Sequence, residues 1–170
     1  APGFIDWVTT MLAARAANDP PTAAQVSAAI DEAVRSGTGA IADIGNTDVA
    51  VEPLQRSALD AWHFHEVLGF KGGRGAAVAQ DAWAAAATRQ ASLDAARPGA
   101  RRLRLGVAAH APYSTAPDLI AGVVAGLAGD AARHASLHLA ESPEELQLLA
   151  HGTGPWRALL ERFGTWDPAW

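Results

Sequence analysis

Apolar residues at helical spacing predict two helices at the start of the chain. The first covers residues 4–17, and its apolar stripe consists of Phe4, Trp7, Val8, Met11 and Leu12. The second follows Thr22, which has Gln25 three residues later as in a capping box, and it ends before Gly37. Both helices precede the first predicted strand.

Four short apolar runs predict buried strands that alternate with helices. The strands lie within residues 38–46, 61–69, 102–114 and 135–141. Helical segments are predicted over 49–59 and 76–96, near Thr115, from Ser142 and over 156–163, and Pro98 with Gly99 breaks the second of them. Strands separated by helices favour right-handed crossovers and a parallel sheet, so the predicted fold class is α/β.

Composition and charge narrow the function classes. The length of 170 residues fits one domain, and the absence of a run of about 18 apolar residues argues against a membrane span. The net charge of -5 is spread along the chain without a basic stripe, so we expect no nucleic-acid partner. Without cysteines, His, Asp and Glu remain as metal ligands. Residues 1–18 do not resemble a signal peptide, so we expect a cytoplasmic protein.

Polar side chains follow each of the four predicted strands. In parallel sheets, ligands bind at the carboxyl ends of the strands, in the loops that lead to the next helix. A purely structural role would scatter polar residues between both ends, so their grouping predicts a shared site. The residues are Asp43 and Asn46, His65 and Glu66, His110 and Tyr113, and His138 and Glu141.

His138 and Glu141 are the strongest candidates for chemistry. A histidine within an apolar strand is either a hydrogen-bonded core residue or a metal ligand. Three residues along a regular strand would place Glu141 on the opposite face from His138. The two can serve one site only if the backbone bends at the strand end, which the helix start at Ser142 favours. Glu141 could then move protons to and from a metal-bound water without being a ligand itself.

Two other histidine motifs have competing interpretations. His110 either caps its own loop or donates a hydrogen bond to a substrate. His63 and His65, at i and i+2, share one face of a strand and could chelate a metal, but no third ligand has an obvious claim to the same ion. We therefore interpret Glu66 as an orienting residue at the strand end, while a different class of enzyme would use it with this histidine pair.

The glycine-rich segment 71–75, KGGRG, could approach a phosphate. It has neither the P-loop spacing nor the dinucleotide-binding spacing. We therefore expect a mobile loop over the site.

With these residues identified, the chain resembles the central part of the amidohydrolase superfamily, in the branch of cytosine, guanine and methylthioadenosine deaminases and triazine hydrolases. Within this branch, FIDWVTTMLAAR and EVLGF are most similar to aminofutalosine deaminase-like proteins. The resemblance covers nearly the whole chain. Its matching segments are GTGAIADIGN, FHEVLGF, GVAAHAPYST, SLHLAESPEEL and GTGPWRALLERFG.

The resemblance implies a (β/α)8 barrel with one divalent metal, Zn2+ or alternatively Fe2+, that activates water for hydrolytic deamination. The implied small-molecule substrate is a purine-like heterocycle. Carried over by position, His138 is the metal ligand and Glu141 the proton shuttle. His110, Glu66 and Tyr113 are assigned to substrate binding.

The chain departs from the family pattern in its metal ligands. The family's HxH pair would lie upstream of residue 1, and a sixth-strand histidine and an eighth-strand aspartate would lie beyond Trp170. We therefore expect residues 1–170 to form a partial barrel domain with strands two to five only, inactive as an isolated chain. Its unpaired edge strands would favour a homo-oligomer. The alternative is a non-catalytic α/β module that binds a small ligand or a partner.

Overall fold

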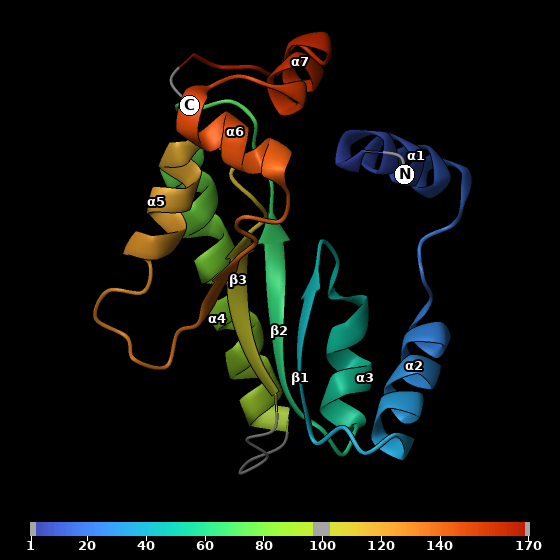
Figure 1. Cartoon of the computed structure of the whole chain (residues 1–170). Coiled ribbons are helices and arrows are strands. Elements are labelled where there is room, and N and C mark those ends of the chain that lie inside the picture. The colour runs from blue at the N-terminus through green and yellow to red at the C-terminus, as the bar shows by residue number, and fades with distance from the viewer. Residues whose placement is uncertain (1–2, 97–102, 169–170) are drawn as a thin grey trace.

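The computed structural model describes residues 3–96 and 103–168, and within them four strands form one parallel sheet (Figure 1). The sheet follows the chain in the order β1 (Ala40–Gly45), β2 (Asp60–Val67), β3 (Leu103–Ala109) and β4 (Ala135–Leu137). Each strand pairs in parallel with the next. The curled sheet and its helices correspond to part of a TIM-type barrel, which confirms the predicted α/β class.

Helices connect the strands and precede the sheet. Thr22 and Gln25 form the predicted capping box, and the Ser142 hydroxyl accepts a hydrogen bond from the Glu145 amide at the predicted helix start. No helix in the described ranges is long and apolar enough to cross a membrane. The elements are α1 (Phe4–Ala17), α2 (Ala23–Arg35), the 3-10 turn η1 (Asp48–Ala50), α3 (Val51–Arg56), α4 (Gly75–Ala96), α5 (Pro117–Ala125), α6 (Pro143–His151) and α7 (Pro155–Arg162).

Two predicted elements are shorter than expected. The fourth strand was predicted over 135–141 but ends at Leu137, because the backbone turns at Ala140, where φ is 61°. The helix predicted over 49–59 divides into η1 and α3, which ends where the Ser57 hydroxyl bonds to the Leu54 carbonyl. The predicted break at Pro98 and Gly99 lies outside the described residues.

The sheet has a helix-facing side and an opposite side, here called the inner face. On β2, Ala61 packs with residues of α2 and α3, and Val67 packs with residues of α4 and α5. Side chains alternate along a strand, so Phe64 projects from the inner face, where it lies over Gly106 of β3. The same alternation assigns each polar strand-end residue to one side of the sheet.

Helices α4 and α5 pack closely where α4 begins. A Cβ atom on Gly75 would lie 2.2 Å from the Leu119 amide nitrogen and 2.6 Å from the Asp118 carbonyl carbon. These neighbours are backbone atoms, which cannot move aside as a flexible side chain can. Glycine at position 75 therefore sets the separation of the two helices.

We predict that Gly75→Ala destabilises the fold by about 1–3 kcal/mol, the usual cost of overpacking. Alanine is otherwise the better helix former, so a loss of stability would come from the contact with α5. Urea unfolding measures the effect, with Gly39→Ala as the matched control because a Cβ atom there meets nothing within 4 Å. Equal unfolding midpoints for the two variants would contradict the packing account.

Candidate functional site

Polar side chains from all four strands meet around Glu66 on the inner face. Asn46, after β1, donates a hydrogen bond through Nδ2 to Glu66 Oε2 at 2.7 Å. Glu66 Oε1 lies 3.7 Å from His138 Nε2 and 4.0 Å from His110 Nε2. The two imidazole rings have centroids 5.5 Å apart. The structure therefore brings together the ends of four strands, as their parallel order predicts.

His110 is fixed by its own loop and presents Nε2 to the site. The Ser114 hydroxyl donates to the Ala111 carbonyl at 3.1 Å, so it accepts from His110 Nδ1 at 2.5 Å. Burial lowers the pKa of His110, and the neighbouring His138 adds to this effect, while Glu66 acts in the opposite direction. The neutral ring with a proton on Nδ1 has an acceptor lone pair on Nε2. His110 can therefore cap its own loop through Nδ1 and still contact a ligand through Nε2.

Glu141 is held by Tyr113, which in turn stacks on Trp156 of α7. The Tyr113 hydroxyl donates to Glu141 Oε2 at 2.5 Å. The centroids of the tyrosine and indole rings are 3.9 Å apart, and the angle between the ring planes is 11°. Burial and the hydrogen bond to Glu141 raise the pKa of Tyr113, so its hydroxyl keeps its proton. The other oxygen, Glu141 Oε1, lies 3.9 Å from His138 Nδ1. Tyr113 therefore orients one carboxylate oxygen and leaves the other beside His138.

A backbone bend brings His138 and Glu141 to the same side of the sheet. Ala140 adopts the left-handed conformation at φ 61°, and no other described non-glycine residue has a positive φ. After the bend, the Glu141 amide donates to Oε2 of the fully buried Glu145 at 2.7 Å. The sequence required a bend at the strand end if Glu141 and His138 were to share a site. The structure has this bend.

We predict that Ala140→Gly stabilises the fold by about 1 kcal/mol, because the left-handed conformation costs an L-residue roughly 1–2 kcal/mol and glycine nothing comparable. Urea unfolding at neutral pH measures the change. Ala132→Gly, at an exposed position without a positive φ, serves as the control and should be neutral or destabilising. A destabilised Ala140→Gly variant would contradict the assigned bend.

The KGGRG segment is anchored to α5 by Asp118. The amides of Gly73 and Gly75 donate to Asp118 Oδ2 at 2.8 and 2.9 Å. The hydrogen bond from Gly75 and the one from Gly73 hold the pKa of Asp118 below its usual range. The expected mobile loop is thus tied down at its end nearest α4.

We predict that Asp118 makes stability pH-dependent. Because its folded pKa is depressed, its stabilising effect is fully present above the unfolded aspartate pKa of about 3.9 and is lost as pH falls through the folded value. The difference in urea midpoint between wild type and Asp118→Asn should be largest at pH 7 and shrink on acidification below about pH 4. Asp81→Asn, at an exposed position of α4, should give no such pH-dependent difference.

The HFH histidines lie on the helix-facing side. His63 is buried, and Glu66 projects from the inner face because it follows His65 directly. The alternative that joined Glu66 to this pair is therefore wrong. The sequence indicated no obvious third ligand for this histidine pair, and the structure corrects this. Asp48 Oδ1 lies 3.6 Å from His63 Nε2 and 3.3 Å from His65 Nδ1.

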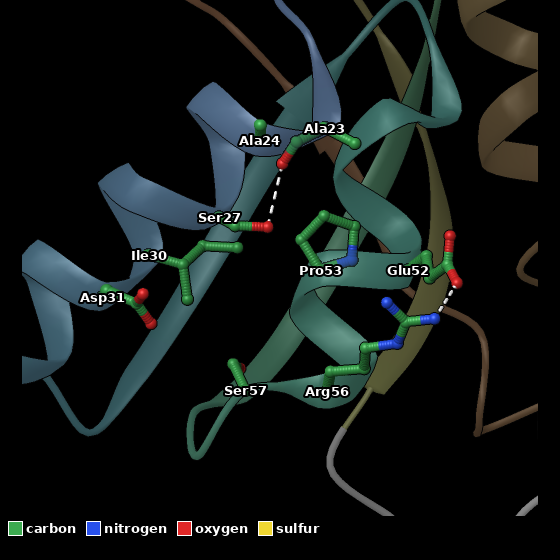
Figure 2. A pocket seen from close by; sticks show the side chains of 9 residues that line it. All are labelled: Ala23, Ala24, Ser27, Ile30, Asp31, Glu52, Pro53, Arg56 and Ser57. Carbon is green, nitrogen blue, oxygen red and sulfur yellow. Dashed lines mark hydrogen bonds and ion pairs between the residues drawn. The ribbon is translucent and has the colours of Figure 1, made fainter.

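A hollow between α2 and α3 lies away from the strand ends (Figure 2). Several of its polar groups are already paired within the chain. The Ser27 hydroxyl bonds to the Ala23 carbonyl, and Arg56 forms an ion pair with Glu52. The hollow is therefore the weaker candidate, and the strand ends remain the candidate site.

Sequence reasoning did not assign the supporting residues of the strand-end site. Ser114 fixes the His110 ring, Trp156 stacks on Tyr113, and Glu145 bonds to the Glu141 amide. The Glu145 carboxylate accepts its hydrogen bond from the residue just before the N-cap Ser142. Trp156 and Tyr113 are 43 positions apart in the sequence, so only the tertiary fold reveals their contact.

No protein-family model and no curated protein matches the sequence. Solved structures of Helicobacter pylori aminofutalosine deaminase do match, at 28% sequence identity. The TM-score is 0.68 for the complex with methylthio-coformycin and 0.65 for a second structure of the enzyme. Each alignment covers 82% of this chain and 32% or 34% of the deaminase chain. The chain therefore spans about a third of the length of these enzymes. Its resemblance to the amidohydrolase superfamily is confirmed.

Proposed function

We propose that the inner-face residues are part of the active site of a metal-dependent hydrolytic deaminase. The observation that carries the proposal is that His138 and Glu141, which follow β4, meet Glu66 of β2 on one side of the strand ends. The likeness to aminofutalosine deaminase supports the reaction class and a purine-like heterocyclic substrate. Water would add to the ring carbon, and the exocyclic C–N bond would break to release ammonia.

His138 is proposed as a ligand of the divalent ion, Zn2+ or Fe2+, that would activate the attacking water. In the described ranges, the one group of three close donors is Asp48, His63 and His65, on the other side of the sheet. The described strand-end residues thus do not form a complete ligand set, since a zinc site needs at least three protein ligands. His138 would be one ligand among several.

Glu141 is proposed as the acid–base group. Its Oε2 is held by the Tyr113 hydroxyl, while Oε1 beside His138 remains open to accept a proton. A carboxylate so oriented can take a proton from water and return it to the leaving amino group, a role worth about 100- to 10,000-fold in rate. Tyr113 would act by positioning Glu141.

His110 and Glu66 are proposed to bind the heterocycle. His110 Nε2 offers an acceptor lone pair, and Glu66, at 11% side-chain exposure, offers a carboxylate oxygen close to both imidazoles. On this geometry His110 accepts a hydrogen bond from a substrate N–H, whereas the sequence suggested that it would donate one. Acceptors of this kind favour a ring that carries N–H donors, as purine-like heterocycles do.

The test measures ammonia release from aminofutalosine and methylthioadenosine by the natural gene product that contains residues 1–170. We predict that Glu141→Gln lowers kcat by about 1,000-fold with metal content unchanged. His138→Gln should lower both activity and metal content. The exposed His151 and the partly exposed Glu144 supply matched controls, His151→Gln and Glu144→Gln, which should retain full activity.

Two outcomes would contradict the proposal. One is a metal-loaded protein that binds these nucleosides but releases no ammonia, which would favour the non-catalytic binding module. The other is a Glu141→Gln variant that keeps wild-type kcat.

A further inference from the structure

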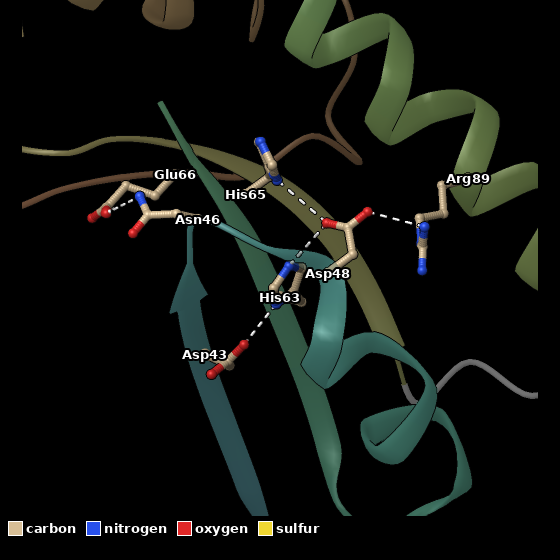
Figure 3. Close-up of polar contacts among 7 residues, drawn as sticks. All are labelled: Asp43, Asn46, Asp48, His63, His65, Glu66 and Arg89. Carbon is tan, nitrogen blue, oxygen red and sulfur yellow. Dashed lines mark hydrogen bonds and ion pairs between the residues drawn. The ribbon is translucent and has the colours of Figure 1, made fainter. Parts of the chain in front are cut away.

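We propose that Asp48, His63 and His65 bind a divalent transition-metal ion, zinc in the first instance, on the helix-facing side of the sheet (Figure 3). This site is separate from the strand-end site, because the His63 and His65 side chains leave the sheet on the side opposite to Glu66. The proposed deaminase chemistry uses none of these three residues. The inference therefore stands or falls independently of that function.

The two distances from Asp48 to the histidines are close to those between ligands in a zinc coordination shell. Asp48 Oδ1 lies 3.6 Å from His63 Nε2 and 3.3 Å from His65 Nδ1, and the three ligand atoms all lie within 4.8 Å of one another. Ligands at about 2.0–2.1 Å from a tetrahedral zinc ion are about 3.3–3.4 Å apart. Two nitrogens and one carboxylate oxygen would leave a fourth position for water.

The buried His63 ring has a nitrogen without a partner. Its side chain is 2% exposed, and its Nδ1 lies 2.6 Å from Asp43 Oδ2. A proton on Nδ1 that donates to Asp43 leaves a lone pair on Nε2, and that buried atom has no hydrogen-bond partner. The lone pair faces the Asp48 carboxylate, which is also an acceptor (Figure 3). A metal cation between these two acceptors would satisfy both of them.

The surroundings match those of metal-binding histidines. A carboxylate that holds the second ring nitrogen, as Asp43 does for His63, commonly orients a metal ligand. Arg89 of α4 binds the other oxygen of Asp48, Oδ2, at 3.0 Å, which leaves Oδ1 for the metal. Asp43, Asp48 and Arg89 together carry one net negative charge when the histidines are neutral. His65 and Asp48 are 42% and 38% exposed, so an ion can enter from solvent.

The bound ion would stabilise the edge of the sheet. Asp48 begins the turn after β1, whereas His63 and His65 belong to β2, so the metal would join two neighbouring segments. An ion that binds the folded chain and not the unfolded chain raises stability by mass action. We therefore expect zinc to raise the melting temperature of the protein.

The test titrates the 170-residue chain with Co2+ and Zn2+. Wild type should show the visible absorption of tetrahedral Co2+ at one equivalent, its displacement by Zn2+, and a rise in Tm with Zn2+. His65→Gln and Asp48→Asn should weaken Zn2+ binding at least about tenfold and abolish both signals. His65 is partly exposed, so its replacement should preserve the fold, which circular dichroism checks. His138→Gln and His151→Gln should bind as wild type does.

Three results would overturn the proposal. The first is a wild-type chain without Co2+ absorption, which would mean that a proton satisfies His63 between the two aspartates. The second is unchanged Zn2+ affinity in folded His65→Gln and Asp48→Asn. The third is loss of the wild-type signal in His138→Gln, which would place the ion at the strand-end site.

Discussion

Parallel pairing of the four strands places every carboxyl end at the same edge of the sheet, and side-chain alternation then divides the residues there between two sides. These two constraints alone place four residues together on the inner face: Asn46, Glu66, His110 and His138. Each comes from a different strand end, and the other three lie within reach of Glu66. His63 and His65 occupy the other side for the same reason. The pair His110 and His138 therefore has different surroundings from the pair His63 and His65.

The inner-face group depends on one departure from regular strand geometry. Without the left-handed Ala140, alternation would send Glu141 away from His138. The bend is supported on both sides: the His138 amide still bonds to the His110 carbonyl at 2.9 Å, and the Glu141 amide bonds to Glu145. Tyr113, in the loop after β3, then holds the Glu141 carboxylate and is itself stacked on Trp156 of α7. The position of the Glu141 carboxylate is therefore set by a loop held by buried groups and not by the strand itself.

Much of the fold could be predicted from the sequence, because helix caps and apolar runs are local signals. Thr22, Ser142 and the order of strands and helices correspond to the structure. The site was harder to predict from the sequence, because its supporting contacts join distant segments. Nothing near HFH indicated that Asp48 would reach both histidines, since that contact depends on the turn after β1. The helix start at Ser142 favoured a bend at the strand end, but the sequence could not place that bend at Ala140.

The central claim is that the strand ends form one ligand site on the inner face, distinct from the helix-facing histidines. Nitrogen-15 NMR of the histidine side chains during titration with methylthio-coformycin tests it most directly. The account predicts that the resonances of His110 and His138 shift together, while those of His63, His65 and His151 do not. Shifts confined to His63 and His65, or none at His110 and His138 under saturating ligand, would contradict it.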